Sequence, residues 1–192
     1  MIILLAIFSI IFVFTLYFVQ SNKTIKFDLK VSEAILSRRS SRLTNIMLFF
    51  TNLGKGKSIL FICFLLFAIP ATGTTLPEVS GIGAFIAFIS SNSLKVIAKR
   101  VRPEGNRLVE ENNFSFPSAH ALAAAALYGG IVLNASVFCD PLKIVMVILS
   151  LLFIFFIGIS RIYLGVHFFT DVIGGWSFGG IISIILTLIF KS

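Results

Sequence analysis

Residues 160–171, with the sequence SRIYLGVHFFTD, separate two long apolar segments and carry an arginine, a histidine and an aspartate. A second polar stretch, 114–120 with the sequence FSFPSAH, holds the other histidine of the chain at the start of a further apolar segment. Ionisable groups are costly beside the hydrocarbon core of a bilayer, so we expect these two stretches to take part in chemistry.

The composition places the chain among integral membrane proteins. Of its 192 residues, 57% are hydrophobic and only 12% are charged, which is far more apolar than a soluble domain. Residues 1–20 carry no charge and are long enough to span a bilayer. They lack a basic start and a small-residue cleavage site, so we interpret them as a retained helix and not a signal peptide. We expect one domain over residues 1–192, with its core motifs in 95–171.

The pattern predicts an all-α integral membrane protein with six transmembrane helices. Residues 28–43 alternate apolar and basic side chains, which predicts an amphipathic helix at the membrane surface between the first and second spans. Two cysteines, Cys63 and Cys139, fall in a predicted span and a predicted loop, where packing is favoured over a disulfide. The six spans are predicted at 1–20, 58–74, 79–97, 118–133, 142–159 and 171–190.

Counting the crossings predicts where the polar stretches meet. The third span ends, and the fourth begins, at the loop 95–117, while 160–171 joins the fifth span to the sixth. With six spans, all these ends lie on one face of the membrane. Three polar clusters that are distant in sequence are therefore expected to converge.

The first cluster is Lys95 and Arg102, the latter followed by Pro103. An arginine presents a planar fork of donors that suits a phosphate, and a lysine adds a point charge. Lys99 and Arg100 lie between them, so taken alone the cluster is better interpreted as an ordinary basic loop beside the membrane.

The second cluster contains Pro117, Ser118, Ala119 and His120. Pro117 is expected to set the entry to the fourth helix, and Ser118 is a good capping residue. Free backbone N–H groups of a first helical turn form an anion site, and His120 would lie beside that anion. A capped helix with an interfacial histidine is an equally good interpretation of this cluster alone.

The third cluster contains Ser160, Arg161, His167 and Asp171. On a helix, His167 and Asp171 would be neighbours because they are four residues apart. A carboxylate beside an imidazole fixes its tautomer and leaves the other nitrogen free as a base or nucleophile. An unpaired charge in a bilayer costs about 2.5–3.5 kcal/mol on insertion scales, so we favour a functional role over a structural ion pair.

Together the clusters predict phosphoryl transfer, in which catalysis is mostly positioning and charge stabilisation. His167 attacks phosphorus and forms a phosphohistidine, and Asp171 orients His167. His120 protonates the departing alkoxide and then activates water. The residues expected to hold the phosphoryl oxygens are Lys95, Arg102, Ser118, Ala119 and Arg161.

The order K-x6-R-P, P-S-x-H and S-R-x5-H-x3-D resembles the phosphatidic acid phosphatase type 2 superfamily, and looks most like its small bacterial phosphatidylglycerophosphatase B-type enzymes. Ala119 stands where the second motif usually has glycine; alanine keeps the backbone N–H but restricts φ. The matching residues are Lys95, Arg102, Pro103, Pro117, Ser118, His120, Ser160, Arg161, His167 and Asp171.

The resemblance implies a metal-independent lipid phosphatase that hydrolyses the phosphate monoester of phosphatidylglycerophosphate or phosphatidic acid. Its partners would be the phosphorylated lipid and the bilayer, with no nucleic acid, no metal and no cofactor. It would be a multi-pass protein of the bacterial cytoplasmic membrane. The sequence does not indicate an oligomeric state.

Several alternatives remain open. An undecaprenyl diphosphate phosphatase or a lipid phosphotransferase would use the same intermediate. A haloperoxidase needs no membrane spans, and a divalent metal would be repelled by the three cations and lacks a further histidine ligand. A small lipid-binding or transport protein is the non-enzyme alternative.

The loop charges bear on orientation and substrate. Lysine and arginine are concentrated on the predicted active face, which by the positive-inside rule would be cytoplasmic. The resemblance implies an active site on the extracytoplasmic face, and we adopt that expectation. The loop acids Glu104, Glu110 and Glu111 would either repel a second phosphate or balance Arg100 and Arg107.

Overall fold

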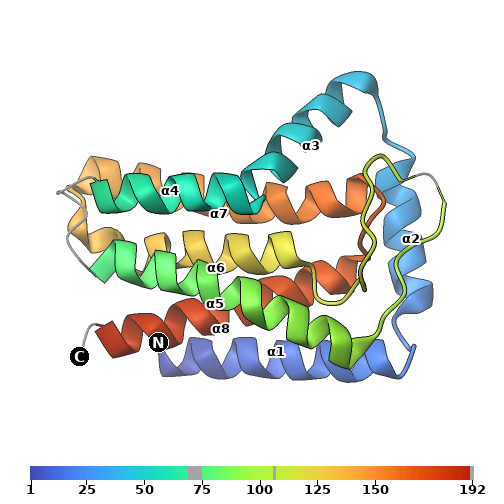
Figure 1. Cartoon of the computed structure of the whole chain (residues 1–192), viewed down its shortest axis with the longest axis horizontal. Coiled ribbons are helices and arrows are strands. Elements are labelled where there is room, and N and C mark those ends of the chain that lie inside the picture. The colour runs from blue at the N-terminus through green and yellow to red at the C-terminus, as the bar shows by residue number, and fades with distance from the viewer. Residues whose placement is uncertain (69–74, 106, 191–192) are drawn as a thin grey trace.

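A computed structural model of the chain describes residues 1–68, 75–105 and 107–190 (Figure 1). This described part is all-helical and contains no strand. The end of the second predicted span, 69–74, lies outside it. The helices are α1 (Ile2–Gln20), α2 (Ile25–Leu36), α3 (Ser41–Leu53), α4 (Gly56–Ala68), α5 (Thr75–Ala98), α6 (Ala119–Leu133), the 3-10 helix η2 (Ala135–Val137), α7 (Asp140–Tyr163) and α8 (Phe169–Phe190).

The long helices run side by side in one bundle, and α6 lies within it, in contact with α5, α7 and α8. Small residues allow these helices to approach closely. A Cβ atom added to Gly175 of α8 would lie 2.8 Å from the carbonyl oxygen of Ser118 and 3.0 Å from the Cβ of Ala121. The backbones of α6 and α8 are therefore in near-direct contact, which fixes the start of α6 against α8.

The helix lengths confirm a membrane-spanning protein. Among the described residues, α1, α5, α7 and α8 are each long and apolar enough to cross a bilayer. Helices α3 and α4, which meet at a bend of 59°, are long and apolar enough when taken together as one span. The helix α6 is apolar but has 15 residues, so it is about 22 Å long, shorter than the roughly 30 Å hydrocarbon core.

The predicted amphipathic helix over 28–43 is wrong in its extent, because the structure has two helices there. The first, α2, ends at Leu36, and α3 begins at Ser41. Ser40 is extended, with φ −148° and ψ 157°, and its hydroxyl accepts a hydrogen bond from the amide of Leu43 at 3.3 Å. This capping bond starts a new helix, which the alternation of apolar and basic residues does not predict.

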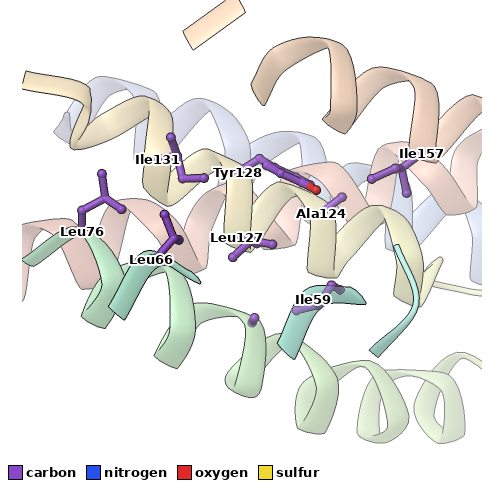
Figure 2. Packing of buried hydrophobic residues seen from close by; sticks show 9 residues of the cluster. Ile59, Leu66, Leu76, Ala124, Leu127, Tyr128, Ile131 and Ile157 are labelled. Atoms are coloured by element: carbon purple, nitrogen blue, oxygen red, sulfur yellow. The ribbon is translucent and has the colours of Figure 1, made fainter. Parts of the chain in front are cut away.

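Apolar side chains of four helices meet in the bundle interior (Figure 2). In contrast, many large apolar side chains on the outer surface are exposed, among them Phe14 of α1 and Phe64 of α4. Such a surface is suited to lipid and not to water. The interior cluster comprises Ile59, Leu66, Leu76, Ala84, Ala124, Leu127, Tyr128, Ile131 and Ile157.

One end of the bundle carries the polar loops. Helix α2 lies across that end, and the loops that follow α5 and α7 lie beside it (Figure 1). Helix α1 begins, and α8 ends, at the opposite end of the bundle. The connections predicted to share one face of the membrane therefore do lie at one end of the molecule.

Candidate active site

His167 and Asp171 are brought together, but not within one helix as the spacing predicts. His167 precedes α8 and Asp171 is in its first turn. The Nδ1 atom of His167 lies 3.4 Å from Oδ2 of Asp171. Both side chains are buried, and Asp171 is fully so. Burial lowers the pKa of His167 to about 4, although Asp171 acts to raise it. The imidazole is therefore neutral near pH 7, as a nucleophile requires.

Both carboxylate oxygens of Asp171 are held by donors. Oδ2 accepts from the amide of Phe168 at 2.8 Å and from the hydroxyl of Ser115. Oδ1 accepts from Arg100 Nη1 at 2.7 Å. These bonds fix the carboxylate that faces His167.

Arg102 joins the loop after α5 to His167. Its Nη1 atom lies 3.2 Å from Nε2 of His167 and donates to the carbonyl of Val166 at 2.7 Å. Its Nε donates to the carbonyl of Asn113 at 2.6 Å, and its Nη2 contacts the Asn113 side chain and the carbonyl of Phe114. In this resting structure the donors of Arg102 all have protein acceptors, so an anion would have to replace some of them.

Oxygen atoms of the loop 111–113 form hydrogen bonds or ion pairs with the cationic side chains of this region. Lys95, in the last turn of α5, donates to Oδ1 of Asn113 at 3.0 Å. Arg161, in the last turn of α7, is bonded to Glu111, whose other oxygen lies 3.7 Å from Arg102 Nη2. Burial acts to raise the pKa of Glu111, but the guanidinium groups of Arg161 and Arg102 outweigh it and hold that pKa below its usual range. Glu111 thus pairs with the predicted phosphate-binding residues, and not with Arg100 or Arg107.

The second cluster forms the start of α6. Ser118 is the residue before the helix, but its hydroxyl does not cap it, contrary to the prediction. Its backbone N–H donates to the carbonyl of Asp171 at 3.0 Å instead, which ties α6 to α8. Ala119 is the first residue of α6 and has no positive φ, so alanine in place of glycine causes no backbone strain here.

Three side-chain atoms in this region are buried without a hydrogen-bond partner among the described residues. They are Ser118 Oγ, His120 Nε2 and Arg161 Nε. His120 lies within electrostatic range of Arg161, His167 and Lys95. Buried polar atoms without partners are unusual in folded proteins and mark a position where a ligand can supply the missing bonds.

Two cavities flank α2 at this end of the bundle. One, of about 510 Å³, is lined by His167 together with residues of α2 and of the loop that contains Pro103. The other, of about 600 Å³, is lined by residues of α1, α2 and the end of α5, and reaches Arg100 and Arg102. Phe168 and Leu29 line both cavities. Of the histidine–aspartate pair, His167 lines the first of these cavities, on the α2 side.

No group of three or more His, Cys, Asp and Glu side chains in the described ranges is placed to hold a metal ion. The cations Lys95, Arg102 and Arg161 surround the site instead. The two cysteines are unpaired: Cys139 is exposed and Cys63 half-buried.

A membrane-spanning helical bundle with cations around a histidine–aspartate pair is the arrangement expected of an integral membrane phosphatase. Residues 79–192 match the model of the PAP2 superfamily. The chain is 33% identical over 172 residues to phosphatidylglycerophosphatase B of Bacillus subtilis (strain 168), covering 84% of this chain and 82% of the relative. It therefore belongs to the PAP2 superfamily. As a member, it is a membrane lipid phosphatase and a metal-independent phosphoric monoester hydrolase.

Two solved structures are similar in fold. The crystal structure of the first transmembrane PAP2-type phosphatidylglycerolphosphate phosphatase from Bacillus subtilis superposes with a TM-score of 0.87 at 27% identity, covering 97% of this chain and 96% of that one. The crystal structure of Aquifex aeolicus LpxE gives a TM-score of 0.68 at 26% identity, covering 82% and 93%.

Sequence reasoning missed several residues that make this region. Asn113 accepts from two cations, and Ser115 bonds Asp171, although both lie within or beside a recognised motif. Asp28, in α2, pairs with Arg100 from 72 residues away. In the sequence, Asp28 is only an acidic residue in a stretch rich in lysine and arginine, and that does not identify a partner.

Proposed function

We propose that this protein hydrolyses the terminal phosphate monoester of a membrane lipid, phosphatidylglycerophosphate or phosphatidic acid, through a phosphohistidine formed on His167. The observation that carries the proposal is the set of buried atoms without partners around the His167–Asp171 pair: Ser118 Oγ, His120 Nε2 and Arg161 Nε. Ser118 and His120 come from the start of α6, and Arg161 comes from the end of α7. A phosphoryl group bound among them would satisfy these atoms.

The anion site is supported by charge. Lys95, Arg102 and Arg161 come from three segments and face the same region, and in the resting structure they are bonded to neutral or acidic oxygens of residues 111–113. Phosphate oxygens would take the place of those oxygens. N–H groups of the first turn of α6, including that of Ala119, would add further donors, as helix N-termini do for anions.

In the first step, Nε2 of His167 attacks phosphorus, a P–N bond forms and the bond from phosphorus to the lipid oxygen breaks. His120 gives a proton to the departing alkoxide, which leaves as the lipid alcohol. Asp171 accepts from Nδ1 and stabilises the positive charge that develops on the imidazole. The cations stabilise the oxygens of the phosphoryl group as it transfers.

In the second step, His120 accepts a proton from a water molecule that attacks the phosphohistidine. The P–N bond breaks, inorganic phosphate leaves and His167 returns to its neutral form. Both histidines end the cycle in their starting protonation states, so the proton transfers of the two steps balance.

The membrane arrangement that fits this proposal has six crossings. These are α1, the bent pair α3–α4, α5, the short α6, α7 and α8. An even number agrees with α1 beginning and α8 ending at one end of the bundle. Helix α2 then lies at the membrane surface, and the active site faces the extracytoplasmic side of a bacterial cytoplasmic membrane.

Phosphate release from a lipid panel tests the substrate. The panel contains phosphatidylglycerophosphate, phosphatidic acid and undecaprenyl diphosphate, assayed in mixed micelles with excess chelator. We expect release from the two monoesters and none from a His167→Ala variant. Release at the normal rate by His167→Ala would overturn the mechanism, and loss of activity in chelator that only a metal restores would overturn the metal-free reaction.

Cysteine labelling in intact cells tests the orientation. Single cysteines replace Arg107, in the active-site loop, or Lys143, near the other end of α7, in a background of Cys63→Ala and Cys139→Ser. An impermeant maleimide is expected to label position 107 and not 143. The reverse pattern would place the active site in the cytoplasm, as the positive-inside rule predicts.

A further inference from the structure

Arg100 joins two buried carboxylates that come from different helices. Its Nη2 lies 2.6 Å from Oδ2 of Asp28 in α2, and its Nη1 lies 2.7 Å from Oδ1 of Asp171 in α8. Both aspartates are fully buried, and the Arg100 guanidinium carbon lies 4.4 Å from the ring centroid of Phe168. Arginine suits this position because its planar fork can bind two carboxylates at once.

Asp28 has a complete set of partners beyond Arg100. Its Oδ1 accepts from the backbone amide of Thr170 at 3.0 Å, and its Oδ2 accepts from the hydroxyl of Thr170 at 2.7 Å. Thr170 also accepts from Arg100 Nη1 at 2.7 Å. Asp28 therefore holds both Arg100 and the backbone of the residue that precedes Asp171.

The charges of this network act on His167. Asp28, Arg100 and Asp171 together carry a net charge of −1, and the oxygen of Asp171 that Arg100 does not bind faces the imidazole. Without Asp28, Arg100 and Asp171 would sum to zero. The positive charge that develops on His167 during phosphoryl transfer would then lose part of its counter-charge.

We propose that Asp28 and Arg100 are positioning residues for phosphoryl transfer, in which Asp28 of α2 fixes Arg100, and Arg100 fixes and tunes the Asp171 carboxylate that orients His167. This inference rests on the proposed function. It makes α2 part of the catalytic architecture and not only a helix at the membrane surface. Neither residue is placed to touch the phosphoryl group, because Nη1 and Nη2 of Arg100 are directed to Asp28, Asp171, Thr24 and Thr170.

The test compares full-length variants in detergent with dioctanoyl phosphatidic acid as substrate. Asp28→Asn is expected to lower kcat by about 10–100-fold, the range typical of partners that orient a catalytic ligand, with KM within about twofold of the wild type. Asp140→Asn is the matched control, since Asp140 is exposed at the start of α7, near the other end of the bundle. It is expected to retain wild-type kinetics.

A double-variant cycle tests whether the two residues act as one unit. If they do, Asp28→Asn combined with Arg100→Gln loses no more activity than the worse single variant. Arg100→Gln is also expected to move the acid limb of kcat/KM to higher pH, because Asp171 then faces His167 without its partner charge while Arg102 and Arg161 remain. The control Asp140→Asn, which leaves this network intact, is not expected to produce that shift.

Wild-type kcat in Asp28→Asn, or losses that multiply in the double variant, would overturn the inference. Thermal unfolding accompanies each assay. If Asp28→Asn does not fold, Thr170→Val takes its place, because it removes the hydroxyl bonds to Asp28 and Arg100 without changing a charge. The kcat of Thr170→Val is expected to fall by roughly threefold to tenfold at unchanged KM. A wild-type kcat in that variant would overturn the inference. Activity in His167→Ala would refute the proposed function, whereas an inactive His167→Ala with wild-type Asp28 variants would refute only this inference.

Discussion

The Nη1 atom of Arg102 lies 3.2 Å from the Nε2 atom of His167. A guanidinium has no acceptor, so Arg102 donates and Nε2 accepts. The imidazole proton is therefore on Nδ1, on the side of Asp171, and the lone pair of His167 is on Nε2. The nitrogen that would attack phosphorus thus faces an arginine expected to hold the phosphoryl oxygens, and the resting contact between them must yield when substrate binds.

Arg102→Lys is expected to lower kcat/KM by about 100-fold, the scale of losing a donor that stabilises transition-state charge. Lysine cannot reproduce the planar fork that contacts Asn113, Val166 and His167 together. Steady-state kinetics with phosphatidic acid measures the loss. Arg107→Lys is the control, because Arg107 in the same loop is exposed and its Nε donates to the carbonyl of Pro103 at 2.8 Å. A loss below threefold in Arg102→Lys would contradict this role.

Glu111→Gln is expected to strengthen inhibition by inorganic phosphate by about tenfold, since a hydrogen bond to a charged group is worth about 1.5–3 kcal/mol. The carboxylate of Glu111 is ion-paired with Arg161, so it would compete with a bound anion for that guanidinium. Product-inhibition kinetics gives the inhibition constant, and Glu110→Gln, at an exposed neighbouring position, is the control. An unchanged inhibition constant would show that Glu111 does not occupy the phosphate position.

The pairing of Glu111 also makes stability depend on pH, because the fold depresses the pKa of its carboxyl. The pair stabilises the folded protein at pH values above the ordinary pKa of 4.5, and this stabilisation is lost as pH falls through the lower pKa of the folded state.

The pH dependence follows from the buried imidazole. The fold lowers the pKa of His167 to about 4. The imidazole therefore stays neutral at pH values below 6.5, the ordinary pKa of a histidine, and is protonated only near pH 4. We expect the corresponding limb of kcat/KM near pH 4. The second ionisation of the substrate phosphate, near pH 6, is measured separately by phosphorus NMR. An enzyme limb between pH 6 and 7 that the substrate does not explain would contradict a neutral, desolvated His167.

Gly54→Ala is expected to lower both stability and activity. Gly54 lies at the bend between α3 and α4, where an added Cβ would be 2.7 Å from Ile157 Cγ2 and 3.0 Å from His120 Cδ2. Relieving this overlap costs typically about 1–3 kcal/mol and displaces His120. Thermal unfolding and kcat report the two effects. Gly56→Ala is the control, because a Cβ there meets nothing within 4 Å; equal effects in both variants would refute the packing argument.

The long apolar helices α7 and α8 were predictable because long apolar segments carry their own signal. The fifth predicted span, 142–159, lies within α7, and the sixth, 171–190, within α8. Their ends were less predictable. Helix α7 continues to Tyr163 and includes Arg161, whose partner Glu111 local sequence does not reveal. The break between α2 and α3 depends on one capping hydroxyl, which hydropathy does not detect.

By itself, the sequence determined that this is a helical membrane protein whose order and spacing of lysine, arginine, serine, histidine and aspartate resembles the PAP2 superfamily, because hydrophobic length and motif spacing are local properties. Only the tertiary structure decided what those residues contact. Ser118 leaves its hydroxyl free, Glu111 lies on Arg161, and Asp28 reaches Asp171 through Arg100. Hydrogen bonds and ion pairs form between groups that the folded bundle brings within about 3 Å of each other, and no pattern in a single segment specifies that distance.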